Sequence, residues 1–245
     1  MKAIGIIPSR YESTRFPGKP LVEINGKTMI QRVYEQSKKA TSLTQVMVAT
    51  DDHRIFNHVK SFNGEVVMTS SFHKSGTERC AEAVSKLSVN FDIVINIQGD
   101  EPFINPEQIN QISSCFDDSK TDIATLIKKI NSDDELFNSN RPKVEIGEDN
   151  FAKMFSRNAI PEIPSTEKKE WLSNQVFFRH IGIYGYRTDV LAKISQLPVS
   201  QLEEKEGLEQ LRWLENNYAI KVAETEHVAI SIDTPEDLKN LTIKP

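Results

Sequence analysis

The stretch that decides the fold lies near the N-terminus and reads Ile4-Gly5-Ile6-Ile7-Pro8-Ser9-Arg10-Tyr11-Glu12-Ser13-Thr14-Arg15-Phe16-Pro17-Gly18-Lys19-Pro20-Leu21. Its apolar start is typical of a buried strand, which runs into a segment of small, hydroxylated and cationic residues. The prolines and the glycine restrict this segment, so it is not a mobile basic tail. Hydroxyl, guanidinium and ammonium groups bind phosphate well. We therefore predict a polyphosphate-binding loop, and an ordinary solvated loop stays open as the alternative. The candidate ligands are Ser9, Arg10, Ser13, Thr14, Arg15 and Lys19.

The composition limits the classes of protein to which the chain can belong. Its 245 residues are enough for one large α/β domain, with or without a smaller appended part. The net charge of −5 argues against bulk binding to nucleic acid or to an anionic membrane, so the cationic loop is better explained as a local anion site. Cys80 and Cys115 form no zinc-binding pattern and predict buried thiols in a reducing compartment. The first apolar run is too short for a signal peptide or a membrane span, so we expect a cytoplasmic protein without membrane insertion.

Strand and helix patterns alternate in the first part of the chain. Alternation at this spacing predicts parallel βαβ units with right-handed crossovers. Ligands of such sheets bind at the carboxyl ends of the strands, so the cationic loop should meet the turns at Thr50-Asp51 and Gln98-Gly99-Asp100. This expected convergence favours the anion site over the solvated loop. Strands are predicted at 45–50, 65–68 and 92–97, and helices at 28–39, 53–61 and 77–87.

The pattern changes from Thr121 onward. Apolar runs predict strands at 122–127, 142–146, 151–155 and 177–186, with a polar excursion at 160–174. We interpret 1–245 as a single domain, in which 1–120 and 187–245 form the core that carries the predicted polyphosphate site, a core that the family resemblance given below identifies as nucleotide-binding. Residues from about 121 to 186 would be an inserted antiparallel subdomain that covers the site and contacts a second subunit. The remaining elements are a helix at 202–217, an extended segment at 222–232, and a short last helix capped at 234–237.

Two carboxylates follow predicted strands and are candidates for binding a metal ion. Asp100 comes after the apolar run 92–97, beside Gly99, which permits close backbone approach to a ligand. Asp233 follows the alternation of Val228, Ile230 and Ile232. Two carboxylates beside a polyphosphate predict Mg²⁺ held by Asp100 and Asp233, with phosphate and water as further ligands. A turn role for Asp100 and a helix-capping role for Asp233 stay open.

Several other polar residues could contact a ligand, and each also has a structural explanation. Ser75, Gly76 and Arg79 open a helix, where they could cap it, bind a ligand, or do both. Gln98 offers both a donor and an acceptor. In the expected insertion, Arg157, His180 and Tyr184 would suit a carboxylated, polyhydroxylated substrate, although a lone His near an apolar run is more often structural. Glu209 and Gln210 lie on a predicted amphipathic helix, where charged residues usually face solvent.

These motifs, taken together and in order, resemble the 3-deoxy-manno-octulosonate cytidylyltransferase family, also called CMP-Kdo synthetases, over essentially the whole chain. Any single motif could arise by chance, but the ordered set is specific. The motifs are Pro8 to Leu21, Ser75-Gly76-Thr77-Glu78-Arg79, Gln98-Gly99-Asp100-Glu101-Pro102, Phe155-Ser156-Arg157 with Ile160-Pro161, Arg179-His180-Ile181-Gly182-Ile183-Tyr184, Leu208-Glu209-Gln210-Leu211-Arg212 and Asp233-Thr234-Pro235-Glu236-Asp237-Leu238.

The resemblance implies a Rossmann-like nucleotide-diphospho-sugar transferase fold, in which helices flank a mostly parallel sheet and an inserted antiparallel subdomain forms a homodimer. It implies transfer of CMP from CTP to a Kdo-type acid sugar, with release of pyrophosphate, for lipopolysaccharide biosynthesis. Arg10, Arg15 and Lys19 would bind the triphosphate, and the segment from Ser75 to Arg79 the cytidine. Asp100 and Asp233 would carry Mg²⁺. The implied sugar site contains Gln98, Arg157, His180, Tyr184 and Glu209, and Gln210 is a further candidate for substrate binding.

Two alternatives to this function remain at the sequence level. A sister cytidylyltransferase acting on 8-amino-Kdo or a sialic acid would use the same kind of sugar site. A catalytically silent nucleotide-binding protein would need a broken active-site element, yet both aspartates and the cationic loop are intact. A dehydrogenase is disfavoured because no GxGxxG pattern follows the first strand.

Overall fold

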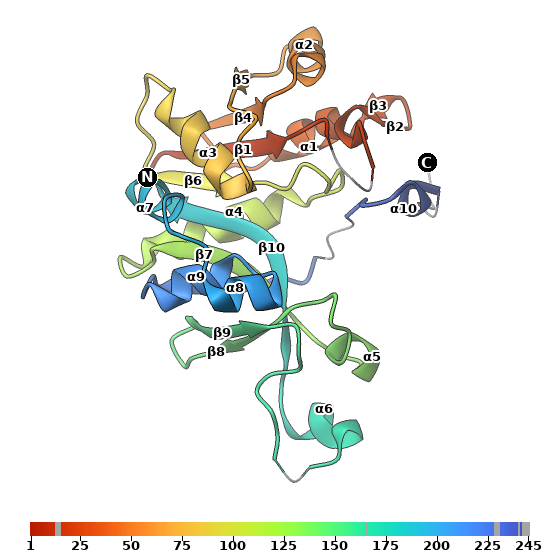
Figure 1. The fold of residues 1–245 in the computed structure, drawn as a ribbon, viewed down its shortest axis with the longest axis vertical. Coiled ribbons are helices and arrows are strands. Elements are labelled where there is room, and N and C mark those ends of the chain that lie inside the picture. The colour runs from red at the N-terminus through yellow and green to blue at the C-terminus, as the bar shows by residue number, and fades with distance from the viewer. Residues whose placement is uncertain (13–15, 165, 228–230, 240, 242–245) are drawn as a thin grey trace. The chain divides into compact units, whose positions relative to one another are not determined.

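The chain folds into two compact units, seen in a computed structural model that describes residues 1–12, 16–164, 166–227, 231–239 and 241 (Figure 1). Unit 1 comprises Met1–Asn110, Arg187–Ser195 and His227–Pro245, and unit 2 comprises Gln111–Tyr186 and Gln196–Glu226. The division expected from the sequence, with an insertion from about 121 to 186 that forms a dimer, stays a prediction.

Unit 1 contains a parallel sheet in the order β6-β1-β4-β5. Its strands are β1 (Ala3–Ser9), β4 (Gln45–Thr50), β5 (Val66–Met68) and β6 (Ile93–Asn96). The βαβ arrangement expected from the alternating pattern is therefore confirmed. The register pairs Ser9 with Thr50, so the chain leaves β1 and β4 side by side at their carboxyl ends.

The helices of unit 1 begin where short polar side chains can cap them. Thr28, Asp52 and Ser75 each accept a hydrogen bond from a backbone N–H of the following turn. The elements around the sheet are η1 (Lys19–Leu21), β2 (Glu23–Ile24), β3 (Lys27–Thr28), α1 (Met29–Ser37), α2 (His53–Ser61), α3 (Gly76–Ser85), α7 (Thr188–Ile194) and α10 (Pro235–Lys239). Helix α4 (Pro106–Ser114) carries the chain from unit 1 into unit 2.

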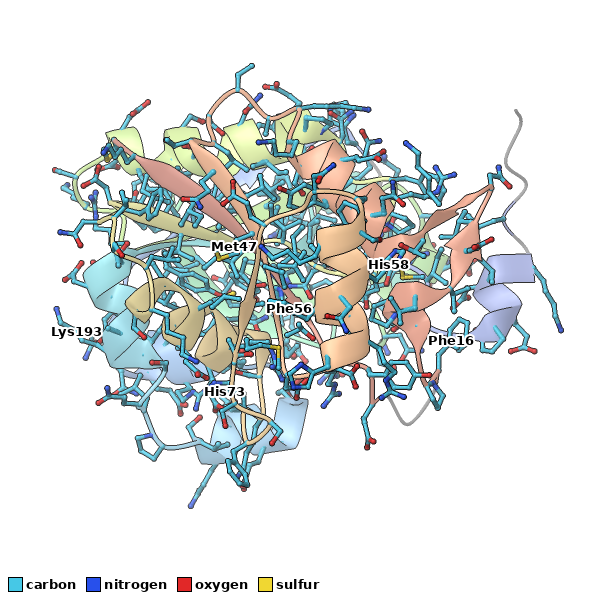
Figure 2. The ribbon with its side chains drawn as sticks, turned by 90° about the horizontal axis from the view of Figure 1, so that it is seen from above. Phe16, Met47, Phe56, His58, His73 and Lys193 are labelled. Atoms are coloured by element: carbon cyan, nitrogen blue, oxygen red, sulfur yellow. The ribbon has the colours of Figure 1, made fainter. Side chains whose placement is uncertain are left out.

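The core of unit 1 is built from the β-branched residues of its strands. Ile4, Ile6 and Ile7 of β1 are fully buried, as is Ile95 of β6. Met47, labelled in Figure 2, lies on β4 and is also buried. Burial on both faces explains why these strands read as continuous apolar runs. The same rigid sheet fixes the positions of the polar loops at its carboxyl edge.

Unit 2 is mainly antiparallel. Strand β10 pairs antiparallel with β7 and β8, β8 pairs antiparallel with β9, and β11 pairs parallel with β7. The antiparallel character expected after Thr121 is therefore confirmed. The elements are η2 (Cys115–Asp117), β7 (Ile123–Lys129), α5 (Asp133–Leu136), β8 (Lys143–Ile146), β9 (Ala152–Ser156), η3 (Lys168–Glu170), α6 (Trp171–Asn174), β10 (Phe178–Arg187), α8 (Gln201–Glu206), α9 (Gln210–Glu215) and β11 (Ile220–Glu224).

One secondary-structure prediction is wrong. The single helix expected at 202–217 is two helices, α8 and α9, because Gly207 takes a left-handed conformation (φ 62°) that ends α8. The extended segment expected at 222–232 is a strand as far as Glu224, and its residues 228–230 lie outside the described residues. Within the part of the chain that the structure describes, no helix is both long enough and apolar enough to cross a membrane.

Candidate active site

A cavity of about 260 Å³ lies in unit 1, lined by the end of β1 and the residues after it, by the turn that follows β6, and by the start of α3 with the loop before it. This arrangement follows from the parallel sheet, whose carboxyl edge collects the polar loops. The lining residues are Pro8, Ser9, Arg10, Lys19, Pro20, His73, Lys74, Ser75, Gly76, Arg79, Gln98, Gly99, Asp100 and Asp233. The structure thus brings together every described residue of unit 1 that the sequence analysis proposed as a ligand.

Lys19 joins the two predicted metal-binding aspartates. Its Nζ lies 2.8 Å from Asp100 Oδ2 and 3.3 Å from Asp233 Oδ1, although Asp233 is far from both residues in the sequence. The ammonium group shows that the two carboxylates converge on one position where a cation is stabilised. Such a pair of hard oxygen donors fits Mg²⁺, which is usually bound through one or two carboxylates together with phosphate and water.

Backbone contacts place the two carboxylates next to each other. The N–H of Ile232 donates a 3.0 Å hydrogen bond to the carbonyl of Asp100. This bond places the backbone of Asp233, the next residue, close to Asp100. The cap of α10 is Thr234, whose Oγ1 accepts from the N–H of Asp237 at 3.2 Å. Asp237 in turn accepts from the N–H groups of Asp233 and Thr234. The capping alternative therefore goes to Thr234, while the side chain of Asp233 contacts Lys19 and lines the cavity.

The backbone around Gly99 is tightly packed. A Cβ atom at this position would lie 3.0 Å from the carbonyl oxygen of Pro8, so a larger residue at position 99 would crowd the approach of the turn after β6 to the end of β1. Ser9, on the other side of this contact, is buried, and its Oγ has no hydrogen-bond partner among the described residues. A buried hydroxyl that lines a cavity without a partner is suited to hydrogen-bond a ligand.

Glu101 lies directly after Asp100 but is buried and does not line the cavity. Burial, together with the neighbouring charge of Asp100, raises its pKa to about 7. The acidic pair is thus divided, with Asp100 at the cavity and Glu101 in the interior. Only Asp100 is placed to contact a ligand.

Arg79 lines the cavity but is largely occupied by protein groups. Its Nη1 donates to Thr69 Oγ1 at 2.7 Å and to the Ser70 carbonyl at 3.3 Å, and its Nη2 to Asp51 at 3.1 Å. The buried guanidinium therefore ties α3 to the ends of β4 and β5. Ser75 caps α3 by accepting from the N–H of Glu78 at 3.2 Å, so its capping and cavity-lining positions coincide.

The remaining predicted site residues lie in unit 2. Arg157, which follows β9, donates from Nε to the Glu206 carbonyl, from Nη1 to that of Ser139 at 3.1 Å, and from Nη2 to that of Gly207 at 3.4 Å. These carbonyls include the C-terminal end of α8, where cationic side chains are favourable. Arg157 thereby fixes the junction between α8 and α9. Helix α9 begins at this junction with Glu209 as its N-cap and Gln210 as its first residue.

His180 and Tyr184 of β10 belong to a cluster of rings. The His180 ring lies 5.2 Å from that of Phe155 and 5.3 Å from that of Tyr184, and Tyr184 meets Trp213 edge-on at 5.2 Å. Burial lowers the pKa of His180 to about 3 and raises the pKa of Tyr184 well above its usual value. Both side chains are therefore neutral at pH 7 and can act as hydrogen-bonding groups but not as ions.

The hydrogen bonds of Thr125 fix the tautomer of His180. Thr125 Oγ1 lies 2.9 Å from His180 Nε2, 2.8 Å from the Ile183 carbonyl and 3.1 Å from the Ile181 carbonyl. Because a hydroxyl has one hydrogen and carbonyls only accept, we infer that Thr125 donates to the backbone and His180 donates its Nε2–H to Thr125. His180 Nδ1 is then the acceptor of the ring.

Glu209 and Gln210 are less exposed than the amphipathic pattern of their segment predicted. Glu209 Oε1 accepts a 2.8 Å hydrogen bond from Arg212 Nη2, and Gln210 is buried. The Nε2 of Gln210 has no hydrogen-bond partner within the described residues. A buried amide donor without a partner among the described residues is consistent with the ligand role predicted for Gln210.

Comparisons with known proteins agree with this geometry. The protein-family description "Cytidylyltransferase" matches residues 4–226. A 3-deoxy-manno-octulosonate cytidylyltransferase from Parabacteroides distasonis is 58% identical over 98% of this chain and 96% of the relative. One from Bacteroides thetaiotaomicron is 54% identical over the same shares. The chain belongs to the 3-deoxy-manno-octulosonate cytidylyltransferase family. It is therefore a nucleotidyltransferase, and the resemblance stated from the sequence is confirmed.

The structure of a CMP:2-keto-3-deoxy-manno-octonic acid synthetase complexed with CTP matches this cytidylyltransferase with a TM-score of 0.90 at 40% identity, covering 98% of this chain and 96% of the other. This likeness confirms the Rossmann-like α/β fold class expected from the sequence. The roles of individual residues stay predictions.

Three predicted ligands cannot be placed in the structure, and two residues that were not predicted line the cavity. Ser13, Thr14 and Arg15 lie outside the described residues, so their predicted roles are untouched by the geometry. His73 and Lys74 line the cavity but were not among the predicted ligands. Their position directly before the Ser75 cap was the signal that could have identified them. Figure 2 shows His73 in the loop before α3.

Proposed function

We propose that this protein transfers CMP from CTP to the anomeric hydroxyl of 3-deoxy-manno-octulosonate (Kdo), giving CMP-Kdo and pyrophosphate. The names of its close relatives and the CTP bound to the solved neighbour support this choice of substrates. The observation in this chain that carries the proposal is the convergence of Lys19, Asp100 and Asp233 in one cavity. Cations and carboxylates in one site are what phosphoryl-group chemistry requires.

Asp100 and Asp233 are proposed to hold Mg²⁺, since their oxygens already converge on the ammonium of Lys19. When bound, the ion would neutralise phosphate charge and lower the pKa of a bound hydroxyl. The fit rests on the donor set, two carboxylates without a thiol or imidazole, which suits a hard cation. Across the described ranges, no cluster of three or more His, Cys, Asp or Glu residues forms a metal site, so phosphate and water would supply the other ligands.

The protein residues would act by positioning the substrates and by neutralising charge. The anomeric oxygen forms a bond to the α-phosphorus of CTP as the bond from that phosphorus to the pyrophosphate oxygen breaks, and the hydroxyl loses its proton. Arg10, Arg15 and Lys19 would hold the triphosphate, and Arg15 and Lys19 would stabilise the charge on departing pyrophosphate. The start of α3, from Ser75 to Arg79, would hold the cytidine.

Five residues of unit 2 are proposed to recognise the acid sugar, and Gln98 of unit 1 keeps its predicted role as a substrate ligand. Neutral His180 and Tyr184 are suited to hydrogen bonds with sugar hydroxyls, and Gln210 offers a buried amide donor. Arg157 and Glu209 complete the proposed set. We further propose a cytoplasmic homodimer that supplies CMP-Kdo for lipopolysaccharide biosynthesis.

The test is pyrophosphate release from CTP or UTP with a panel of acid sugars, in the presence of Mg²⁺ or of a chelator. We expect turnover with CTP, Kdo and Mg²⁺, little with UTP, and none with chelator. Faster turnover with 8-amino-Kdo or a sialic acid would replace Kdo with a sister substrate. Tight CTP binding without pyrophosphate release from any acid sugar would contradict the proposed reaction.

A further inference from the structure

An arginine outside the cavity is stacked on the loop that follows β1. We propose that Arg54, through the ring of Tyr11, is a positioning residue that holds Gly18 and the adjoining Lys19 in the position that binds the triphosphate. This inference deepens the proposed function and rests on it, because the ligand of the loop is taken to be CTP. Arg54 does not line the cavity and therefore acts through Tyr11.

The guanidinium of Arg54 lies over the face of the Tyr11 ring. Its Cζ lies 3.3 Å from the ring centroid, a close cation–π contact. Asp52 fixes the plane, because its Oδ1 accepts from Arg54 Nε at 3.0 Å and its Oδ2 accepts from Nη2 at 2.6 Å. Such a two-point contact orients an arginine more strictly than a single ion pair would. Asp52 also caps α2, so the guanidinium is anchored to a helix start.

The Tyr11 residue in turn joins the two ends of the loop. The N–H of Gly18 donates a 2.9 Å hydrogen bond to the Tyr11 carbonyl. Gly18 has a φ of 72°, and a Cβ atom there would lie 3.1 Å from the Tyr11 ring, so the ring packs directly on the glycine backbone. Lys19, the cation between the two aspartates, is the next residue. The contacts therefore run without a gap from Arg54 through Tyr11 and Gly18 to Lys19.

Strand register explains why these residues meet. Ser9 and Thr50 are partners in the pairing of β1 with β4, so Tyr11 and Asp52 each follow a paired residue by two positions. The turn after β4 is fixed by the N–H of Asp52, which donates to Thr50 Oγ1 at 3.2 Å. The sheet thus places Arg54 beside Tyr11.

A simpler explanation is that Arg54 only makes an exposed ion pair with Asp52. The Arg54 side chain is 57% exposed, and pairs of this kind usually contribute little. The two explanations differ in their consequences. If Arg54 makes only an ion pair, its loss should change neither the hydrogen exchange of the Gly18 amide nor the affinity for CTP. If Arg54 positions Gly18 and Lys19 through Tyr11, a role called the brace below, its loss should change both.

The test compares Arg54→Gln with the matched control Lys60→Gln. Lys60 lies on the same helix, with its Nζ 5.9 Å from the Phe56 ring centroid, and makes no hydrogen bond or ring contact with Tyr11 or Gly18 among the described residues. In the full-length protein without ligand, hydrogen exchange at the Gly18 amide should become about two- to fivefold faster in Arg54→Gln, as expected for loss of an exposed cation–π contact. The Kd for CTP, measured by calorimetry, should rise by a similar factor, and Lys60→Gln should change neither quantity.

Variants of Tyr11 separate the ring from its hydroxyl. Tyr11→Phe keeps the stacking surface and should behave like the wild type in both measurements. Tyr11→Ser should match Arg54→Gln or exceed it, and adding Arg54→Gln to Tyr11→Ser should have no further effect on CTP binding. Additive losses in the double variant would show that the two residues act separately and would overturn the brace.

The two proposals fail in different ways. Failure of the wild type to bind CTP would contradict the proposed function, whatever happens at Gly18. Normal CTP binding and unchanged Gly18 exchange in Arg54→Gln would overturn the brace alone. Faster Gly18 exchange with an unchanged Kd for CTP would also overturn it, because the loop would then be braced without consequence for its ligand.

Discussion

Asp100→Asn separates the chemistry of the cavity from the stability of the fold. The substitution keeps the shape of the side chain but removes one of the two carboxylates on Lys19. The Lys19 and Asp100 side chains are 15% and 27% exposed, and Lys19 keeps Asp233 at 3.3 Å. A partly exposed pair with a remaining partner should cost about 1 kcal/mol of unfolding free energy or less.

The expected loss of activity is much larger. If Asp100 helps to neutralise the charge of the reacting phosphates, its removal should lower kcat about 100- to 1000-fold, the range seen when one charge-stabilising group is lost. That loss corresponds to about 3 to 4 kcal/mol in the transition state. The variant should therefore be folded and nearly inactive, a combination that a purely structural Asp100 would not give.

The assay measures pyrophosphate release at saturating CTP and Kdo with Mg²⁺, beside urea denaturation of the same samples. Asp189→Asn is the matched control, because Asp189 pairs with Lys193 at 3.0 Å at an exposed position of unit 1 away from the cavity. It should lose neither activity nor much stability. A kcat within about threefold of the wild type in Asp100→Asn would refute the role of Asp100, and a loss of several kcal/mol in stability would refute the argument from exposure.

Three further predictions concern His180, Glu82 and Thr234. Burial lowers the pKa of His180 from 6.5 to about 3, so between these pH values only the unfolded chain binds this proton. The free energy of unfolding should therefore fall as the pH falls from 6.5 to 3. In urea titrations, His180→Gln should flatten the slope of the unfolding free energy against pH. Burial alone would raise the pKa of Glu82, but hydrogen bonds from Lys86, the Ser70 N–H and His73 outweigh this effect and lower the pKa from 4.5 to about 2. Glu82→Gln should therefore lower the Tm at pH 7. The difference in Tm from the wild type should disappear as the pH falls from 4.5 towards 2. Thr234→Ala should cost about 1 kcal/mol through loss of the α10 cap and should lower kcat through the adjoining Asp233, whereas Thr234→Ser should restore both in paired denaturation and turnover assays.

The architecture of unit 1 could be predicted because its sequence pattern is local. Continuous β-branched runs such as Ile93 to Asn96 indicate strands buried on both faces, and their alternation with helices leaves few topologies. Once the strands are parallel, their carboxyl ends share an edge. The meeting of Lys19 with Asp100 follows from that rule, and the structure adds Asp233 through the backbone contact of Ile232 with Asp100.

The contacts of individual side chains could not be predicted in the same way. The motif around Arg79 indicated a helix start, but its three protein partners come from the ends of two other strands. The helix expected at 202–217 failed because its apolar spacing continues across Gly207, whose left-handed backbone ends α8. Amphipathic spacing reports which residues face the core, and it does not report whether the backbone turns between them.

The stack of Arg54 on Tyr11 shows the limit of motif reasoning most clearly. Tyr11 lies inside the cationic motif, but Arg54 lies in a helix that the motif does not include, and only the pairing of Ser9 with Thr50 brings them together. Residues that contact a substrate are constrained by its chemistry and therefore form recognisable patterns. A residue that holds a loop from behind is constrained only by the neighbouring strand, so many side chains could serve. Differences in CTP affinity between members of this family should therefore arise partly at such positions, where the loop motif itself is unchanged.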